Sequence, residues 1–462
     1  MGLQTAVDSK KEEFLAGFSN PEVQAILSEV YDRNPEQSEF LQAVRGVVLS
    51  VEPVFEKHPE YLKALRVVCE PERQIIFRVP WLDDAGNWRV NRGFRVQFSS
   101  VLGPYKGGLR LHPSVNLSVI KFLGFEQIFK NALTTLPLGG GKGGSDFDPK
   151  GKSEAEIMRF CQSFMTELQR HIGAGIDVPA GDIGVGGREI GYLFGQYKRI
   201  ADRWEGVLTG KAASWGGSFI RPEATGYGAV YMAEKLLADR GDALEGASAL
   251  VSGSGNVAQY CAELLIAKGA KVLTLSDSLG YVYAPEGITQ ELVDEIKDLK
   301  LRKGKLSELE GRNGISYVAG ERPWKHVKGA TLAFPCATQN ELDAEDAEAL
   351  AASGVKYVLE GANMPSTEGA HEVYRKTGVV FVPGKAANAG GVAVSGLEMA
   401  QNAALVGKWS REKVAAELQR IMLDIYREMS AAAKEYNVDL SYGADIAGFV
   451  LVAQGILDMG AC

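Results

Sequence analysis

Gly253-Ser254-Gly255-Asn256-Val257-Ala258 is the stretch that decides the fold of the second half of the chain. It fits the GxGxxG/A dinucleotide fingerprint, in which the first glycine permits a tight turn and the second lets a pyrophosphate approach a helix N-terminus. Apolar residues 247–251 precede it as a strand, residues 257–268 follow as a helix, and residues 271–275 form a second strand. This order of elements is the context in which the fingerprint is meaningful. We therefore predict a dinucleotide site formed by Gly253, Ser254, Gly255, Asn256 and Val257.

Residues 331–334, 356–359 and 379–382 are short apolar strands with helical stretches between them. Strands that alternate with helices predict a parallel, doubly wound sheet. Residues 223–239 precede this region with a helical pattern, and residues 410–434 and 446–457 follow it with two more. The second half of the chain is thus predicted to be a Rossmann-like α/β domain.

The N-terminal half changes its periodicity along the chain. Residues 20–68 follow a helical pattern, whereas residues 73–79 and 92–98 are strand-like. Helices are predicted at residues 117–133 and 153–172, the second with a capping box formed by Ser153 and Glu156. With 462 residues, the chain is long enough for two or three domains.

The composition excludes several classes of function. A net charge of −8 disfavours nucleic acid and anionic membranes as partners. The five cysteines show no CxxC spacing, which indicates a reducing compartment and no structural metal site. We expect no apolar run close to the ~20 residues of a membrane span, and the polar N-terminus does not fit a signal peptide. The sequence therefore predicts a cytoplasmic protein.

Asp277 ends the second strand of the predicted dinucleotide unit. An acidic residue there usually hydrogen-bonds the ribose 2′-hydroxyl of NAD. The hydroxyls of Ser276 and Ser278 could instead bind a 2′-phosphate, and lysines remote in sequence could neutralise the charges. These residues alone leave the choice between NAD and NADP open.

Three lysines and one aspartate stand in glycine-rich or helical settings between residues 103 and 187: Lys106, Lys130, Lys142 and Asp182. Glycine lets a backbone approach a ligand closely, and a surface lysine has no need of such neighbours. We expect the four residues to form a site for an anionic substrate with an acid/base group beside it.

The chemistry of this group also follows from its surroundings. A lysine near other cations and away from water has its neutral form favoured, so it can act as an acid/base or polarise a carbonyl. Gln127 and Lys130 lie on the same helix face. Residues 139–144 do not form a phosphate-binding P-loop, because Leu136 and Gly143 stand where that motif needs Gly and Ser or Thr. Asp182 could either reach the lysines from its loop or cap a turn.

Four motifs resemble those of the glutamate dehydrogenases: Pro104-Tyr105-Lys106-Gly107-Gly108-Leu109-Arg110, Gly139-Gly140-Gly141-Lys142-Gly143-Gly144, Pro179-Ala180-Gly181-Asp182 and Arg221-Pro222-Glu223-Ala224-Thr225-Gly226-Tyr227-Gly228. The chain is most similar to the small, hexameric, NADP-dependent branch of the Glu/Leu/Phe/Val dehydrogenase family, from about residue 32 to the C-terminus. The first thirty or so residues look like an extension.

This resemblance implies an α/β protein of two domains. Residues 1–215 would form a substrate-binding and oligomerisation domain with a mixed sheet, completed by a C-terminal helix at residues 438–462. Residues 216–437 would form the Rossmann-like domain, with the active-site cleft between the two.

The resemblance also implies a role for individual residues. Lys106 would bind the distal carboxylate of glutamate or 2-oxoglutarate together with Ser395. Lys130 and Gln127 would hold the α-carboxylate, Lys142 would polarise the 2-oxo group and activate water, and Asp182 would move protons to and from ammonia and the amino group. Positions near the nicotinamide would be Thr225, Gln339, Asn363 and Asn388, and those that favour a 2′-phosphate would be Lys150, Ser278 and Lys300.

The implied activity is the reversible oxidative deamination of L-glutamate to 2-oxoglutarate and ammonium with NADP, in amino-acid metabolism and nitrogen assimilation. The implied assembly is a homohexamer. Two alternatives remain. A dehydrogenase for branched or aromatic amino acids would have apolar side chains in place of Lys106 and Ser395, and a catalytically silent relative would lack Lys142 or Asp182.

Overall fold

The computed structural model describes residues 2–312, 314–405 and 407–460, and the chain divides into two compact units. Unit 1 comprises Met1–Phe219, Ser395–Ser410 and Asp445–Cys462, and unit 2 comprises Ile220–Val394 and Arg411–Ala444. The sequence prediction placed residues 395–410 in the dinucleotide-binding domain, whereas here they group with unit 1. The chain passes between the units at four points, and two of these lie inside helices, α15 (Gly390–Ala404) and α17 (Leu440–Met459), where no change in periodicity marks the boundary.

Unit 1 is built on a mixed sheet whose strand order, in the described part of the chain, is β1-β2-β4-β3-β5. β1 pairs antiparallel with β2 and β2 with β4, while β3 runs parallel to both β4 and β5. The register places Lys142 opposite Val96 and Lys106 opposite Val178. The strands are β1 (Arg73–Leu82), β2 (Trp88–Ser99), β3 (Tyr105–Leu111), β4 (Gly140–Ser145) and β5 (Asp177–Gly181).

Three helices of unit 1 follow the strands in sequence and pack against the sheet or each other. α6 (Leu117–Leu133) begins at Asn116, whose side chain accepts a hydrogen bond from the Val119 N–H, and it has the predicted bounds. α7 (Glu154–Leu168) has the predicted capping box between Ser153 and Glu156 but ends before residue 172. The remaining elements of this segment are α8 (Gly187–Ala201) and the 3₁₀ turn η1 (Ala213–Trp215).

Sequence patterning missed three of these strands. β3, β4 and β5 contain Tyr105-Lys106-Gly107-Gly108, Gly140-Gly141-Lys142-Gly143 and Pro179-Ala180-Gly181. Glycine and proline are depleted in strands, so such segments read as loops. They become strands because each is buried and its backbone groups pair within the sheet.

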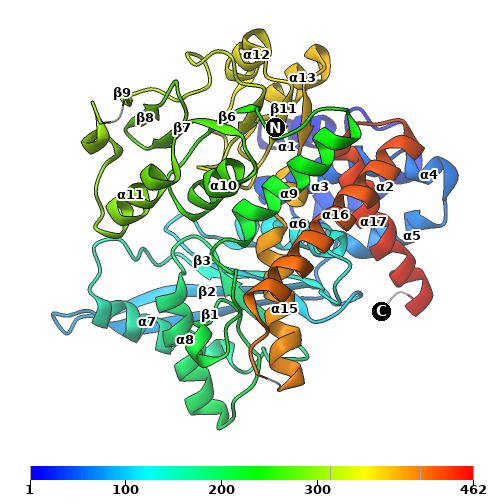
Figure 1. Ribbon diagram of the computed structural model, residues 1–462. Helices are drawn as coiled ribbons and strands as arrows, with labels where there is room; N and C mark the ends of the chain where they lie inside the picture. Colours follow the sequence, from blue (N-terminus) through cyan, green and yellow to red (C-terminus); the bar gives the residue numbers. More distant parts are fainter. Residues whose placement is uncertain (1, 313, 406, 461–462) are drawn as a thin grey trace. The chain divides into compact units, whose positions relative to one another are not determined.

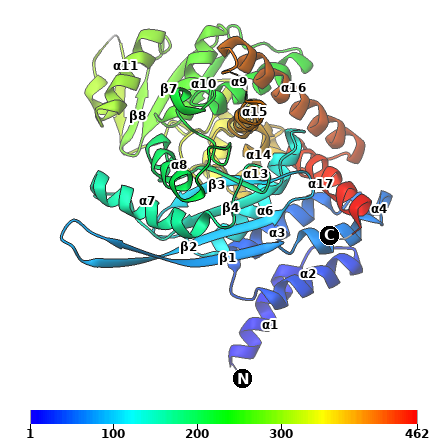
Figure 2. The same ribbon diagram turned by 90° about the horizontal axis from the view of Figure 1, so that it is seen from below.

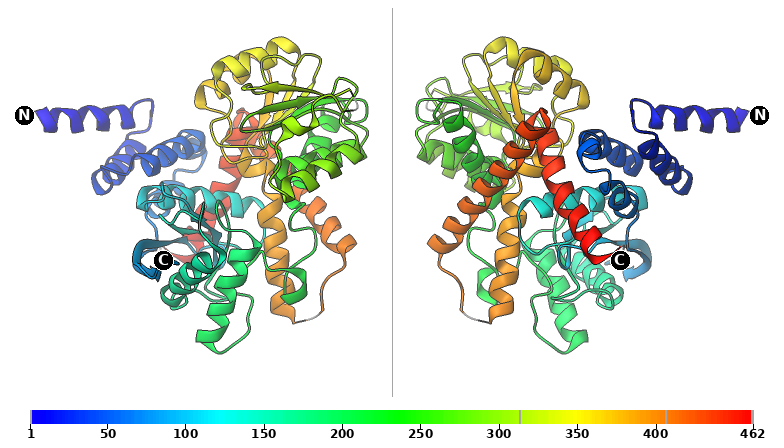
Figure 3. Two further views of the ribbon diagram at one scale, coloured as in Figure 1. Left: turned by 90° about the vertical axis from the view of Figure 1, so that its left-hand side faces the viewer. Right: turned by 90° about the vertical axis from the view of Figure 1, so that its right-hand side faces the viewer.

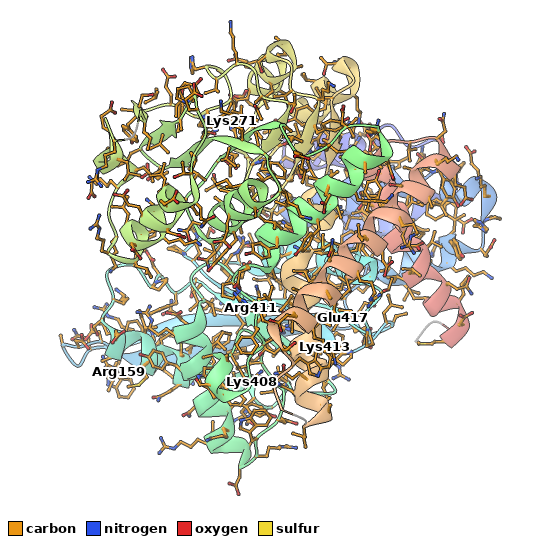
Figure 4. The ribbon with its side chains drawn as sticks, in the orientation of Figure 1. Arg159, Lys271, Lys408, Arg411, Lys413 and Glu417 are labelled. Atoms are coloured by element: carbon orange, nitrogen blue, oxygen red, sulfur yellow. The ribbon has the colours of Figure 1, made fainter. Side chains whose placement is uncertain are left out.

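The β1–β2 hairpin is long, and α7 runs alongside it, as Figure 2 shows. Arg159 on α7 donates from Nε to the Leu82 carbonyl over 2.7 Å and pairs through Nη2 with Asp84, also at 2.7 Å. Arg159 is labelled at this side of the molecule in Figure 4. These contacts tie the outer half of the hairpin to the helix.

The N-terminal segment of unit 1 is helical, as predicted. α1 (Gly2–Leu15) extends outward in both views of Figure 3, and its C-terminal end contacts α2 through Phe14, whose ring centroid is 5.6 Å from that of Tyr31. The other helices are α2 (Pro21–Arg33), α3 (Ser38–Val51), α4 (Val54–Lys57) and α5 (Tyr61–Val68).

One sequence expectation about membranes was wrong. α17 is long and apolar enough to cross a bilayer, although no apolar run of that length was expected. Its Phe449 ring packs edge-on against Phe55 at 5.7 Å, and a Cβ at Gly448 would lie 3.1 Å from Cβ of Phe129. Half of its apolar stretch is buried inside the protein.

Unit 2 contains a doubly wound sheet with the order β12-β11-β10-β6-β7-β8-β9 among the described residues (Figure 1). The strands from β12 to β7 are parallel, as predicted, whereas β8 and β9 add antiparallel pairs that the sequence did not reveal. The strands are β6 (Ser248–Val251), β7 (Lys271–Asp277), β8 (Gly280–Tyr283), β9 (Ser316–Ala319), β10 (Leu332–Phe334), β11 (Tyr357–Leu359) and β12 (Val380–Val382).

Most helices of unit 2 lie between its strands in sequence, as in a dinucleotide-binding fold, whereas α9 precedes the first strand and α14 and α16 follow the last. Arg411 at the start of α16 donates from Nη1 to Glu223 just before α9, over 2.9 Å, and is labelled in Figure 4. The elements are α9 (Ala224–Asp239), α10 (Asn256–Ala267), α11 (Gln290–Leu301), η2 (Leu306–Leu309), α12 (Ala344–Ser353), α13 (Glu368–Thr377), α14 (Gly384–Ala387) and α16 (Arg411–Tyr436).

Candidate active site

Lys142 and Asp182 lie together in unit 1, as the sequence predicted. Lys142 is on β4 and Asp182 directly follows β5; Nζ of Lys142 is 3.3 Å from Oδ1 of Asp182. Arg110, near the end of β3, approaches from the other side, with Nε 2.7 Å from Oδ2 of Asp182. The three side chains are almost buried, Asp182 being the most exposed at 13%. A carboxylate is therefore held between two cations in a place with little water.

Burial and neighbouring charges shift the pKa of both acid/base residues. Burial lowers the pKa of Lys142 below its ordinary value; Arg110 and Arg95 act in the same direction, while Asp182 opposes them. Burial of Asp182 opposes its ionisation, but Lys142 and Arg110 outweigh this effect and lower the pKa of Asp182 to about 2. Asp182 thus stays ionised near neutral pH, while Lys142 releases its proton more easily than a surface lysine.

Lys106 is almost completely buried on β3, at 1% exposed. Its Nζ donates to the Val178 carbonyl over 2.9 Å and to Oγ1 of Thr209 over 2.7 Å. A buried ammonium needs such partners, because desolvation of an unpaired charge is costly. Lys106 is therefore held in a fixed position two residues from Gly108, beside which Asp182 lies.

Helix α6 brings Gln127 and Lys130 to the same sheet. The Gln127 side chain lies 3.3 Å from the position of a Cβ at Gly107 and donates from Nε2 to Oδ1 of Asn131 over 2.7 Å. Asn131 in turn donates from Nδ2 to the Lys106 carbonyl over 3.0 Å. Lys130 is partly exposed on this helix. These hydrogen bonds fix the position of α6 relative to β3.

The glycines around the lysines have a different role from the one inferred from sequence. A Cβ at Gly107 would lie 1.7 Å from the Gly141 carbonyl oxygen, and one at Gly108 would lie 2.9 Å from Cβ of Asp182. At Gly143 it would lie 3.0 Å from Cδ of Arg95. The glycines at these positions are thus required by close packing within the protein, a requirement that the sequence did not reveal.

Arg95, which the sequence reading did not single out, explains part of this packing. From β2 it donates through Nε to Oδ2 of Asp177 over 2.8 Å and through Nη1 to the Gly107 carbonyl over 3.1 Å. Gln97 donates to the same Asp177 carboxylate over 3.0 Å. Both members of the Arg95–Asp177 pair are fully buried. The missing side chains of β4 leave room for this large side chain.

The two remaining residues predicted in this part of the protein lie in different surroundings. Ser395 is buried on α15 and belongs to unit 1 with the lysines. Lys150 is exposed and lines a cavity of about 440 Å³ together with Asp182. Three residues of the site were given no role from the sequence: Arg110, which was quoted only as the end of a motif, and Asn131 and Thr209, which nothing in the local sequence sets apart.

The predicted dinucleotide loop in unit 2 has the required geometry. Gly253 follows β6 with φ +86°, a conformation that favours glycine, and its N–H donates to Oγ of Ser276 over 2.7 Å. Gly255 caps α10, and a Cβ built there would meet no atom within 4 Å. The space at the helix N-terminus is therefore open to a pyrophosphate. Ser254 is buried, and Asn256 and Val257 begin α10.

Asp277 at the end of β7 is bound mainly to protein groups. Its carboxylate accepts from the N–H groups of Leu279 and Leu306, each over 3.0 Å, and Oδ2 is 3.2 Å from Nζ of Lys300. Burial opposes ionisation, but these bonds outweigh it and lower the pKa of Asp277. Ser278 beside it is exposed. Lys300 thus lies where it neutralises Asp277, next to an accessible hydroxyl.

The positions assigned to the nicotinamide end also lie in unit 2. Asn388 donates from Nδ2 to the Ala362 carbonyl over 3.0 Å and to Oδ1 of Asn363 over 2.8 Å. Thr225 lies beside Gly391, where a Cβ would come within 2.6 Å of its hydroxyl oxygen. Gln339 is exposed on the segment after β10.

A doubly wound unit with an open glycine turn, and a second unit with buried lysines around a carboxylate, define a dinucleotide-dependent enzyme with acid/base chemistry. Comparison with known families identifies the class. The family model described as Glutamate/Leucine/Phenylalanine/Valine dehydrogenase matches residues 216–460, and that of the Glu/Leu/Phe/Val dehydrogenase dimerisation domain matches residues 71–199. The chain belongs to this family of amino-acid dehydrogenases.

Individual relatives are similar over almost the whole chain. The NADP-specific glutamate dehydrogenase of Chlorella sorokiniana is 60% identical over 99% of this chain and 88% of its own length. That of Escherichia coli is 54% identical over 95% of this chain and 98% of its own. The crystal structure of Plasmodium falciparum glutamate dehydrogenase has a TM-score of 0.93 at 53% identity, covering 95% of this chain and 94% of that one.

Proposed function

We propose that this protein catalyses the reversible oxidative deamination of L-glutamate to 2-oxoglutarate and ammonium with NADP(H). The observation that carries the proposal is the buried Lys142–Asp182–Arg110 cluster, in a chain 54–60% identical to proteins named NADP-specific glutamate dehydrogenases. A substrate with two carboxylates accounts for two further lysines, Lys106 and Lys130, that the acid/base step does not use. The hypothesis that the protein is a catalytically silent relative is disfavoured, because Lys142 and Asp182 are both present and their side chains are in contact.

Substrate binding divides between two anchors. Lys106 and Ser395 bind the distal carboxylate, whereas Lys130 and Gln127 bind the α-carboxylate. Fixing both ends of the substrate converts the reaction at C2 into an oriented, effectively unimolecular step. The hydrogen bonds that hold Lys106 to Val178 and Thr209 pre-organise the first anchor.

Proton transfer is the task of Lys142 and Asp182. In the direction of amination, the Lys142 ammonium polarises the 2-oxo group and protonates its oxygen as ammonia adds to C2, while Asp182 takes a proton from the added nitrogen. Asp182 then gives this proton to the hydroxyl group, which leaves as water and yields the protonated imine. With its pKa near 2, Asp182 is a weak base while both cations hold it. Transfer of the Lys142 proton removes one of these cations and raises the pKa of Asp182, so the two groups act as a coupled pair. Bound NADPH supplies the hydride that reduces the resulting imine.

We assign the coenzyme to the carboxyl edge of the parallel strands of unit 2, with the pyrophosphate at Gly253 to Val257. Thr225, Gln339, Asn363 and Asn388 are assigned to the nicotinamide end, and Ser278 and Lys300 to the 2′-phosphate. The ion pair of Lys300 with Asp277 supports NADP, because it neutralises a carboxylate that would repel a phosphate.

The activity is tested by following NADPH and NADH oxidation with 2-oxoglutarate and ammonium. We expect rapid NADPH oxidation that requires both substrates. Replacing 2-oxoglutarate by the 2-oxo acids of leucine or phenylalanine should give little activity. A folded protein that consumes neither coenzyme would show that the proposed reaction is wrong.

The exposed Ser278 hydroxyl provides a test of coenzyme choice. Ser278→Ala should raise KM for NADPH about tenfold, because a hydrogen bond to a charged group contributes about 1.5 kcal/mol or more. KM for NADH should stay unchanged, since NADH has no 2′-phosphate. Ser316→Ala, at another exposed serine of unit 2, serves as the control. Equal effects on both coenzymes would place the 2′-phosphate elsewhere.

The pH dependence follows from the lowered pKa of Lys142. Oxidation of glutamate needs the neutral amine as a base, so kcat/KM should rise with pH and level off above the pKa of Lys142. The midpoint should fall below the ordinary lysine value of 10.5. No acid limb from Asp182 should appear above about pH 3, because its pKa is about 2. A rate that is flat between pH 6 and 10 would contradict this assignment.

We further propose a homohexamer in the cytoplasm. A relative 26% identical to this chain with a TM-score of 0.79 is titled a hetero-hexameric glutamate dehydrogenase from Thermus thermophilus, and residues 71–199 match a dimerisation domain. The described cysteines Cys69, Cys161, Cys261 and Cys336 are free and buried, which suits a reducing compartment, while Cys462 lies outside the described residues. Sedimentation velocity distinguishes a hexamer from a dimer directly.

A further inference from the structure

A nearly buried histidine in unit 2 lies between two carboxylates. Nε2 of His371 is 3.3 Å from Oε1 of Glu360, and Nδ1 is 3.6 Å from Oε2 of Glu368. The His371 ring stacks on that of Phe381 in β12, with centroids 4.5 Å apart and planes 17° from parallel. A neutral imidazole carries one N–H, whereas one carboxylate within hydrogen-bond distance of Nε2 and a second close to Nδ1 both favour a positively charged ring. The geometry therefore selects the imidazolium form.

The charged groups around His371 agree with this protonation state. Glu360 faces the ring from the segment after β11, and Glu368 and Arg375 belong to its own helix α13, Arg375 being bonded to Glu368 over 3.1 Å. Burial favours the neutral ring, but the hydrogen bonds to Glu360 and Glu368 outweigh it and raise the pKa of His371 to about 9. The ring is therefore a cation throughout the neutral range.

Glu360 connects this cation to the edge of the sheet where β11 and β12 end. It is buried, at 2% exposed, and its N–H donates to the Val382 carbonyl over 3.1 Å. Its second carboxylate oxygen, Oε2, accepts from the N–H of Gly384 over 2.8 Å. Gly384 is the first residue of α14, the short helix whose C-cap residue is Asn388. One carboxylate thus binds both the imidazolium and the start of this helix.

A second set of contacts links the same two segments. Asn388 donates to the Ala362 carbonyl and to Oδ1 of Asn363, which are two and three residues after Glu360. A Cβ at Gly361 would lie 3.2 Å from Cγ1 of Val257 at the start of α10. Residues 360–363 and 384–388 are therefore joined to each other and touch the helix whose N-terminus faces the open glycine turn.

We propose that Glu360 is a positioning residue of the coenzyme site and that the His371 imidazolium is its counter-ion. The inference rests on the proposed function, in which Asn363 and Asn388 lie at the nicotinamide end. The ion pair fixes the Glu360 carboxylate so that Oε2 meets the Gly384 N–H, and this sets the position of α14 and Asn388. Without its cation, a buried carboxylate reorients toward water or takes up a proton, and that contact is lost.

A pH dependence of coenzyme binding follows by linkage. If the imidazolium supports the binding conformation, Kd for NADPH is constant well below the pKa of His371 and rises above about pH 9, by at most tenfold per pH unit. Bound coenzyme raises the pKa of His371 correspondingly.

The test is a fluorescence titration of NADPH into the full-length protein between pH 7 and 10, with wild type and three variants. Glu360→Gln should raise Kd about tenfold at pH 7.5 and raise KM for NADPH in parallel; a loss of folded protein alone would lower kcat and leave Kd unchanged. His371→Gln keeps one N–H toward Glu360 and should remove the rise of Kd above pH 9. His326→Gln, at a histidine 53% exposed and paired with Glu321, should behave as wild type.

The wild-type titration and the NMR titration of the His371 ring require no variant to fold. A His371 ring that titrates near 6.5, or a rise of Kd above pH 9 that persists in His371→Gln, would overturn the proposal. Wild type that binds NADPH and turns over, with Glu360→Gln within twofold of it in Kd, would also overturn it and leave the proposed function intact. Wild type that fails to bind NADPH would overturn both.

Discussion

Replacing Lys142 by alanine is expected to reduce turnover of 2-oxoglutarate and ammonium by about 10⁴-fold, equivalent to about 5.5 kcal/mol of transition-state stabilisation. Two contributions are lost at once. The cation that polarises the 2-oxo group is removed, and oriented groups of this kind contribute 10²- to 10³-fold. The acid/base partner of Asp182 is removed as well, and general acid/base catalysis contributes 10²- to 10⁴-fold. Steady-state NADPH oxidation measures the loss.

Binding of NADPH should survive the same substitution, because the dinucleotide turn belongs to unit 2 and Lys142 to unit 1. Lys198→Ala, at an exposed lysine of α8 in unit 1, controls for the general removal of a charge. Asp182→Asn should also lower turnover steeply, and the double variant should be little slower than Lys142→Ala alone, since residues that act as a unit are not additive. A Lys142→Ala enzyme within tenfold of wild type would rule out its catalytic role.

Replacing Arg95 by methionine is expected to lower the free energy of unfolding by about 3–5 kcal/mol. This is the cost of leaving the other member of a buried ion pair without its counter-ion. Asp177 would then lie fully buried with Gln97 as its remaining side-chain donor. Net stabilities of domains are about 5–15 kcal/mol, so the effect is a large part of the total. Denaturant unfolding at a fixed protein concentration measures it.

Two further variants test whether the loss of stability in Arg95→Met comes from the buried charge. Arg95→Met combined with Asp177→Leu should recover part of the loss, because no uncompensated charge is then buried. Arg89 lies on the same strand as Arg95, β2, but it is 57% exposed and pairs with Asp83 of the preceding turn. Arg89→Met should therefore lower the free energy of unfolding by at most about 1 kcal/mol. Equal losses at Arg89 and Arg95 would mean that burial does not determine the contribution of these pairs.

The two halves of the chain differ in how well local sequence predicts them. In unit 2, strands and helices alternate with short turns, so period and turn chemistry gave β6, α10 and β7 within two residues of their ends. The glycine turn was recognisable because Gly253 needs a positive φ, and because a residue without a side chain at Gly255 leaves space at the helix N-terminus. Both requirements can be seen in the residue type.

The substrate side shows the opposite case. β3, β4 and β5 are strands because of burial and pairing between distant segments, although their glycines and prolines disfavour strands locally. Arg110, Thr209 and Arg95 are ordinary in their local sequence, and their importance comes only from the partners that the fold gives them.

The sequence by itself therefore determined the class of fold, the dinucleotide turn and, through its motifs, the family and the candidate lysines. Only the tertiary structure decided that the glycines beside those lysines are needed for packing, that Arg110 holds Asp182 from the other side, and that Asp277 is tied to Lys300. The physical reason is the distance along the chain over which each effect acts. Period, capping and backbone conformation act over a few residues, whereas desolvation and charge pairing depend on neighbours that can be a hundred positions away in the chain.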